Sequence, residues 1–86
     1  MGKFALRELL NKLLWDPRED PGEYEIVYES RGAPGGVVRI SAARVTKVFS
    51  RGFEYETERG FLYIPFHRVV EVRKIGTGEL AYVRRR

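Results

Sequence analysis

The fold depends on one nine-residue stretch, Ile64-Pro65-Phe66-His67-Arg68-Val69-Val70-Glu71-Val72. Proline cannot donate a backbone hydrogen bond to a sheet, and it pushes the preceding residue toward extended geometry. We therefore expect Ile64 to end a strand and Pro65 to open a turn that leads into a second strand. His67 and Arg68 then lie at a corner on a rigid sheet, which is a common position for binding groups.

The same pattern occurs twenty-four residues earlier, in Ile40-Ser41-Ala42-Ala43-Arg44-Val45-Thr46-Lys47-Val48. The two stretches share Ile, Arg, Val and Val at matching positions. Each is expected to send a strand into a one-turn bend, opened by Ser41 or Pro65, after which Val-x-x-Val returns to the sheet. The sequence therefore predicts two strand-turn-strand corners.

Turn signals divide the rest of the β-rich part into short strands. They lie in Gly32-Ala33-Pro34-Gly35-Gly36, Arg51-Gly52, Glu58-Arg59-Gly60 and Gly76-Thr77-Gly78. About six short strands and one helix favour an α+β fold, either a small curled, mostly antiparallel β-sheet or a partly open barrel. We expect residues 24–83 to form this part and residues 84–86 to form a basic, frayed tail.

The start of the sequence is expected to form an amphipathic helix over residues 3–15, within a single domain over residues 1–86. Its apolar positions recur at three- and four-residue steps; they are Phe4, Leu6, Leu9, Leu10, Leu13 and Leu14. An isolated helix of this length is marginal in water, so we expect this face to pack on the open side of the sheet. The alternative is that the leucine face, with Trp15, binds a partner protein.

Composition narrows the class of protein. The 86 residues are 43% hydrophobic and 33% charged, as in a small globular domain. The sequence has no cysteine and one histidine, which excludes disulfides and thiolate metal sites, so we expect no cofactor and no metal. No segment approaches the roughly 18 to 20 apolar residues of a membrane span, and none resembles a secretory signal. These features predict a cytoplasmic protein with no membrane partner.

Positive charge is concentrated after residue 30. Residues 1–30 contain four Lys or Arg against seven Asp or Glu, whereas residues 31–86 contain twelve against five, giving net charges of −3 and +7. Most of the cations are arginine, whose planar guanidinium suits bidentate contacts with phosphate, although adaptation to heat produces similar composition. A positive surface of this kind predicts a polyanionic partner.

The candidate binding residues follow from this charge and from the corner. Arg31 lies at the end of the first hairpin among glycines, where little side-chain bulk would block a ligand. Arg31 and Arg68 can form charge-assisted hydrogen bonds to phosphate oxygens, while His67 donates from one ring nitrogen. We expect Phe66 or Tyr63 to stack a terminal base. We also predict that His67, Arg68 and Arg31 converge on one surface pocket.

Four motifs follow one another along the chain: Leu-Leu-x-x-Leu-Leu-Trp-Asp-Pro, Tyr-x-Ile-x-Tyr-x-x-Arg-Gly, Ile-Pro-Phe-His-Arg-Val-x-Glu-Val and Gly-Glu-Leu-x-Tyr. In this order they resemble a small archaeal family, the RNA cyclic group end recognition domain. The most specific parts are Tyr28-x-x-Arg31-Gly32 and Ile64-Pro65-x-His67-Arg68, so the resemblance adds Tyr28 to the candidate residues. The resemblance covers nearly the whole chain.

The resemblance implies a binding role in RNA processing or repair. Relatives are fused to RNA-end-processing modules, such as two-histidine phosphoesterases and nucleotidyltransferases, and are proposed to recognise RNA ends that bear a 2′,3′-cyclic phosphate. The implied partners are RNA termini, with RNA-end-processing enzymes as further partners. This sequence contains no such module, so any chemistry would need a separate protein.

Three functions remain open. Acid-base cleavage or formation of a cyclic phosphate needs two proton-transfer groups, and the sequence offers one histidine and no evident paired carboxylates, so we expect a non-enzyme. An RNA-end-binding module predicts salt-sensitive RNA binding. A protein-interaction adaptor predicts an exposed apolar helix face, and a small RNA-end-processing enzyme predicts turnover that is lost when His67 is changed.

Overall fold

The structure is a computed structural model that describes residues 2–84, with side chains described from Ala5 onward. The described chain forms one α-helix, seven strands and four short 3-10 helices. The helix is α1 (Gly2–Trp15), and the strands are β1 (Tyr24–Glu29), β2 (Val37–Ser41), β3 (Val45–Val48), β4 (Gly52–Thr57), β5 (Gly60–Pro65), β6 (Val69–Lys74) and β7 (Leu80–Val83). The 3-10 helices are η1 (Pro21–Glu23), η2 (Pro34–Gly36), η3 (Ala42–Arg44) and η4 (Phe66–Arg68).

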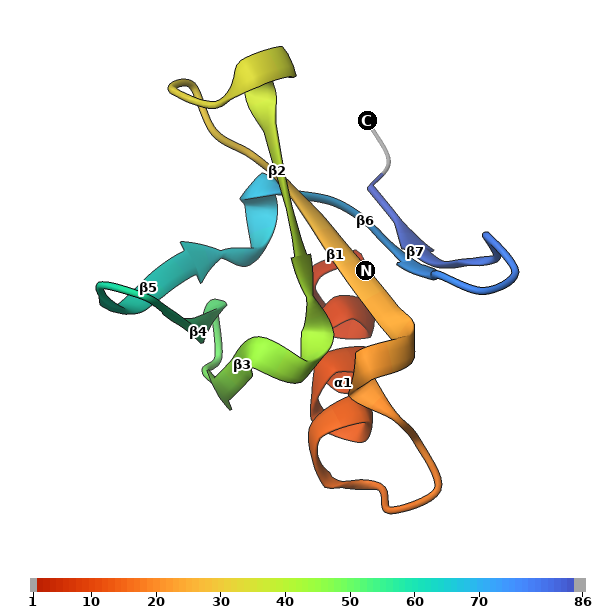
Figure 1. The fold of residues 1–86 in the computed structure, drawn as a ribbon. Coiled ribbons are helices and arrows are strands. Elements are labelled where there is room, and N and C mark those ends of the chain that lie inside the picture. The colour runs from red at the N-terminus through yellow and green to blue at the C-terminus, as the bar shows by residue number, and fades with distance from the viewer. Residues whose placement is uncertain (1, 85–86) are drawn as a thin grey trace.

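The strands form two antiparallel sheets that do not close into a barrel (Figure 1). One sheet has the strand order β2-β1-β6-β7, and the other has the order β3-β4-β5. The predicted α+β class, with an N-terminal helix on mostly antiparallel strands, is therefore confirmed. The strands are divided between two sheets because the chain bends sharply where it leaves β2 and again where it leaves β5.

Both predicted corners are present at these bends. Within them η3 connects β2 to β3, and η4 connects β5 to β6. Ser41 and Pro65 are the N-caps, and Val45 and Val69 follow the two turns with similar backbone angles, φ −68° and ψ 127° against φ −74° and ψ 127°. Ser41 Oγ accepts a hydrogen bond from the Ala43 N–H, whereas Pro65 has its φ fixed by its ring. The repeat in the sequence is thus a repeat in the structure.

The core lies between the two sheets and the helix. β1 is central in its sheet, where Ile26 pairs with Ile40 on β2 and with Val72 on β6, and all three side chains are buried. The three-stranded sheet contributes side chains from its inner face, of which Phe53 and Ile64 are almost fully buried. Because β2 and β6 flank β1, and η3 directly follows β2 while η4 directly precedes β6, the central strand holds both corners in place.

A buried hydrogen bond joins the two sheets through the core. The hydroxyl of Tyr28 on β1 lies 2.6 Å from the hydroxyl of Tyr55 on β4, and the two ring centroids are 6.1 Å apart. Both residues are buried. Burial, together with this hydrogen bond, raises the pKa of Tyr28 above its ordinary value, so the phenol stays neutral at physiological pH.

The predicted leucine face of α1 is largely buried. Leu6, Leu10 and Leu13 are 0%, 2% and 3% exposed, Leu9 and Leu14 are half-buried, and the side chain of Phe4 lies outside the described part of the chain. The helix packs against β3, β7 and both corners. The adaptor alternative is not supported for this face, because its central leucines are inaccessible. Trp15, at the end of the helix, is exposed. Among residues 2–84, no helix has the length and apolar character needed to cross a bilayer.

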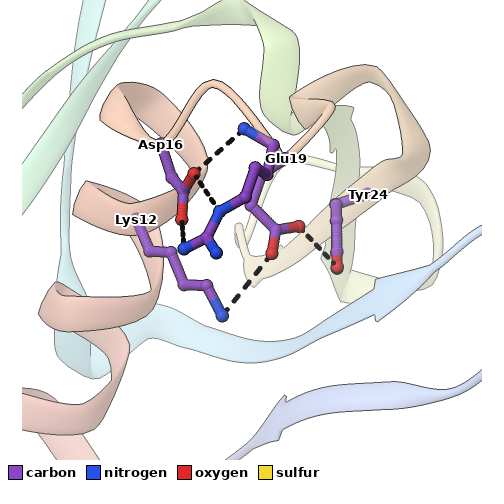
Figure 2. Close-up of polar contacts among 5 residues, drawn as sticks. Lys12, Asp16, Glu19 and Tyr24 are labelled. Atoms are coloured by element: carbon purple, nitrogen blue, oxygen red, sulfur yellow. Dashed lines mark hydrogen bonds and ion pairs between the residues drawn. The ribbon is translucent and has the colours of Figure 1, made fainter.

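Polar contacts connect the end of α1 to the start of β1 (Figure 2). The Arg18 guanidinium bonds the Asp16 carboxylate and holds the pKa of that carboxyl below its usual value. The Glu19 carboxylate accepts a hydrogen bond from the Tyr24 hydroxyl at 3.3 Å and lies 3.5 Å from Lys12 Nζ. Exposed pairs of this kind contribute little stability individually. Through Glu19, the loop is thus connected both to α1 and to β1.

The burial of the helix predicts a large effect of Leu10→Ala. Removing a fully buried leucine side chain costs roughly 2 to 5 kcal/mol of unfolding free energy, through lost transfer energy and the cavity that remains. Denaturant unfolding followed by circular dichroism measures this loss. Trp15→Ala is the matched control on the exposed side of the helix end and should change stability by about 0.5 kcal/mol or less. A near-neutral Leu10→Ala would show that the helix is not docked.

The tyrosine pair predicts strong coupling between Tyr28→Phe and Tyr55→Phe. Each single change leaves one buried hydroxyl without its partner, at a cost of about 1 to 3 kcal/mol, whereas removing both hydroxyls leaves none unpaired. The double variant should therefore lose less stability than the sum of the two single variants. A double-mutant cycle in denaturant measures the coupling. Additive losses would contradict a shared hydrogen bond.

Candidate functional site

The η4 corner positions the histidine. Phe66 is 2% exposed and anchors the turn in the core, while its backbone N–H donates to the Arg51 carbonyl at 2.9 Å. The N–H of Val69 closes the turn on the Phe66 carbonyl. Successive residues of so tight a turn point in different directions, so burial of Phe66 leaves His67 exposed at the surface. The sequence expectation that His67 lies at a corner is therefore confirmed.

Arg31 lies in the loop that joins β1 to β2. The loop is closed by a hydrogen bond from the Ser30 N–H to the Gly36 carbonyl at 2.9 Å. Gly35 and Gly36 have φ values of 74° and 79°, a region that residues with a side chain rarely adopt. The Arg31 side chain is exposed and makes no hydrogen bond or ion pair with the described residues.

One open depression brings the predicted residues together. It has a volume of about 680 Å³ and is lined by Glu29, Ser30, Arg31, Gly36, His67 and Arg68. The expected convergence of Arg31, His67 and Arg68 is thus observed, although the first belongs to the β1–β2 loop and the others to η4. Their role in binding stays a prediction.

Arg68 is held along one edge of its guanidinium. Its Nε and Nη2 donate to the Glu29 carbonyl at 3.0 and 2.7 Å, and its guanidinium carbon lies 5.6 Å from the centre of the Tyr28 ring. Nη1 makes no hydrogen bond with residues 2–84. The side chain is therefore fixed by β1, with donors left for an anion.

The sequence interpretation missed Glu29 and Arg84. Two nitrogens of Arg84 donate to the two carboxylate oxygens of Glu29 at 3.0 and 3.1 Å, and Nη1 also donates to the His67 carbonyl at 3.3 Å. The hydrogen bond with Glu29 raises the pKa of Arg84. We expected residues 84–86 to form a frayed, solvated tail, and for Arg84 this prediction is wrong, because its side chain is bonded to Glu29 and to the η4 corner. Arg85 and Arg86 lie outside the described residues. Side chains alternate along β7, so Arg84 lies on the same face as Tyr82. This alternation is the sequence feature that could have predicted the position of Arg84.

Two predicted aromatic residues do not reach the surface. Phe66 and Tyr28 are 2% and 3% exposed, so neither is available to stack a base. The reason is the small core, which needs large apolar side chains at the corner and on the central strand. Tyr28 still supports the site, because its ring lies under Arg68. Tyr63 is half-exposed on β5 and lines a neighbouring depression together with His67.

The described residues do not assemble a metal centre. Within residues 2–84, no group of three or more histidine, cysteine, aspartate or glutamate side chains is close enough to hold an ion. The positive and hydrogen-bonding groups of the depression are instead suited to an anion of phosphate type.

Comparison with known proteins identifies the family. Residues 4–84 match the family described as "MJ1316 RNA cyclic group end recognition domain". A UPF0248 protein of Methanococcus vannielii is 39% identical over 77 residues, which cover 90% of this chain and 88% of that protein. UPF0248 protein MJ1316 of Methanocaldococcus jannaschii is 37% identical over 82 residues (95% and 96%), and a UPF0248 protein of Pyrobaculum calidifontis is 42% identical over 81 residues (94% and 99%). The resemblance seen in the sequence motifs is confirmed, and the chain belongs to the MJ1316 RNA cyclic group end recognition domain family.

Proposed function

We propose that this protein binds RNA ends that carry a 2′,3′-cyclic phosphate, as a recognition module in RNA processing or repair. The observation that carries the proposal is the depression in which Arg31, His67 and Arg68 meet. The description of the family, which names recognition of RNA cyclic-group ends, agrees with it. The net charge of +7 over residues 31–86 adds a general attraction for RNA.

Each side chain has a distinct part in the proposed contact. Arg31 is exposed and makes no hydrogen bond with the described residues, so it is free to approach a phosphate oxygen from the loop. Arg68 is already oriented by the Glu29 carbonyl, so little side-chain entropy is lost when it binds an anion. His67 supplies one further N–H donor in the same depression.

The depression favours holding a phosphate over reacting with it. His67 is the single histidine, and the carboxylate that lines the same depression, Glu29, already accepts two hydrogen bonds from Arg84. Reaction of a cyclic phosphate by acid-base catalysis needs two groups that exchange protons. We therefore assign any enzyme that acts on these ends to a separate protein, which this module would deliver to the RNA.

The Glu29 carboxylate also suggests how a cyclic end is selected. A cyclic phosphate is a diester with one negative charge, whereas a terminal monophosphate carries about 1.5 to 2 negative charges at neutral pH. The Glu29 carboxylate repels a phosphate in proportion to the charge of that phosphate, whereas Arg31 and Arg68 attract it in the same proportion. Glu29, although it is paired with Arg84, therefore reduces the advantage that the two arginines would give to a terminal monophosphate.

The proposal predicts that Arg31→Ala weakens binding to cyclic-ended RNA more than binding to hydroxyl-ended RNA. Loss of one charge-assisted hydrogen bond costs about 1.5 to 3 kcal/mol, or roughly 10- to 150-fold in affinity. Fluorescence anisotropy with short RNAs that differ only at the 3′ end measures both affinities. Salt should affect both RNAs, since the backbone contacts release counterions in either case.

Arg59→Ala is the control for charge. Arg59 is an exposed arginine in the β4–β5 turn, outside the depression, so its removal lowers the net charge equally. It should weaken both RNAs alike and only slightly. If Arg31→Ala behaves in the same way as Arg59→Ala, the depression does not read the end and the protein is a general RNA binder.

Glu29→Gln should reduce the preference for cyclic ends over 3′-monophosphate ends. A pair of unit charges about 4 Å apart interacts by about 1 kcal/mol in a water-like medium, and a monophosphate has about 0.5 to 1 more charge than a cyclic phosphate, so the affinity ratio should fall about two- to fivefold. The amide oxygen can still accept a hydrogen bond from Arg84, and a thermal melt checks that the fold is kept. An unchanged ratio would mean that Glu29 plays no part in selectivity.

A further inference from the structure

A second depression adjoins the first at His67. It has a volume of about 510 Å³ and is lined by Ser50, Arg51, Tyr63, Pro65 and His67. His67 lines both depressions; Arg31 and Arg68 line only the first, and Arg51 and Tyr63 line only the second. One side chain is thus shared by two depressions of different chemistry.

The Tyr63 ring is held in place without being buried. It packs against Gly52, where a Cβ atom would lie 2.5 to 2.6 Å from the Tyr63 hydroxyl and ring. Phe49 meets the ring edge-on, with centroids 5.8 Å apart and an interplanar angle of 61°. Even so, Tyr63 is 47% exposed. A braced, half-exposed aromatic ring is a platform on which a flat group can stack at little entropic cost.

Arg51 supplies a cation at the same depression. Its backbone carbonyl accepts the hydrogen bond from Phe66, which ties the β3–β4 loop to the η4 corner. Its side chain is exposed and makes no ion pair or hydrogen bond with residues 2–84. A guanidinium beside an exposed aromatic ring is the combination that binds single-stranded nucleic acid, by stacking and by charge.

We propose that this second depression binds the nucleobase of the terminal nucleotide, stacked on Tyr63 beside Arg51. The inference rests on the proposed function, because it takes the phosphate of that nucleotide to lie in the first depression. A nucleotide carries its base and its phosphate on one ribose, and the two depressions share His67 as a lining residue. Stacking tolerates every base, so the subsite recognises that a base is present and does not read its identity.

The test compares three RNAs that share one sequence and differ at the 3′-terminal nucleotide. The first carries a base and a 2′,3′-cyclic phosphate, the second is abasic with the same cyclic phosphate, and the third carries a base and a 3′-hydroxyl. We expect the abasic RNA to bind about 5- to 150-fold more weakly than the first, as loss of one base-aromatic stack does. Tyr63→Ala should weaken the first RNA by a similar factor and leave the abasic RNA unchanged.

Two matched variants control for folding and for general apolar contact. Tyr63→Phe keeps the ring and should keep the affinity for the base-bearing RNA. Phe61→Ala removes an exposed ring on the same strand, outside the depression, and should have no effect on either RNA. A loss with Phe61→Ala equal to that with Tyr63→Ala would overturn the assignment of the base to this depression.

The comparison separates the two proposals. Equal affinity for abasic and base-bearing RNAs, together with a preference for the cyclic end, would overturn the base subsite and leave end recognition intact. Equal affinity for cyclic and hydroxyl ends would overturn end recognition. In that case, a lower affinity of Tyr63→Ala for the base-bearing RNA alone would still support the base subsite. An unchanged affinity would overturn the subsite as well.

Discussion

The fold depends on one constraint, which is that the chain crosses from one sheet to the other twice. Both crossings lie next to the central strand β1. β2 and β6 both pair with β1, and each is joined to the other sheet by a single turn of 3-10 helix. So short a corner has to bury its first side chain to close the core, which Ala42 does in η3 and Phe66 does in η4. The next residue is then turned outward, as Ala43 and His67 are. Exposure of the histidine is therefore a consequence of how the corner packs.

The candidate site is connected to the core through a short series of contacts. The Tyr55 hydroxyl bonds that of Tyr28, the Tyr28 ring lies under Arg68, and Arg68 bonds the Glu29 carbonyl. Arg84 then ties Glu29 to the backbone of η4. The Arg68 guanidinium, held in this way, is partly shielded from water. Its attraction for an anion is therefore stronger than that of a mobile surface arginine. The position of Arg68 therefore depends on Tyr28 and Tyr55, which are buried and do not line the depression.

The sequence was sufficient to predict those features that depend on residues close together in the chain. The Ile-x-x-x-Arg-Val-x-x-Val repeat predicted both corners, because proline or serine at the start of a turn and spaced valines after it act within a few residues. It did not reveal that Phe66 and Tyr28 are buried, since motif specificity says nothing about which way a side chain points. Nor did it reveal the pair between Glu29 and Arg84, which depends on the pairing of β6 with β7. That pairing shifts register between Val72 and Arg73, and such an irregularity is set by packing.

Charge alone does not explain how an RNA end would be distinguished from the rest of the strand. An internal phosphodiester and a cyclic phosphate both carry one negative charge, so Arg31 and Arg68 attract them equally. Discrimination between them has to come from the shape of the depression, since an internal phosphate is followed by another nucleotide and a cyclic end is not. The β1–β2 loop contributes Ser30, Arg31 and Gly36 to the lining. Its course depends on the positive φ angles of Gly35 and Gly36, so these glycines help to set the shape of the depression although they have no side chain to place in it.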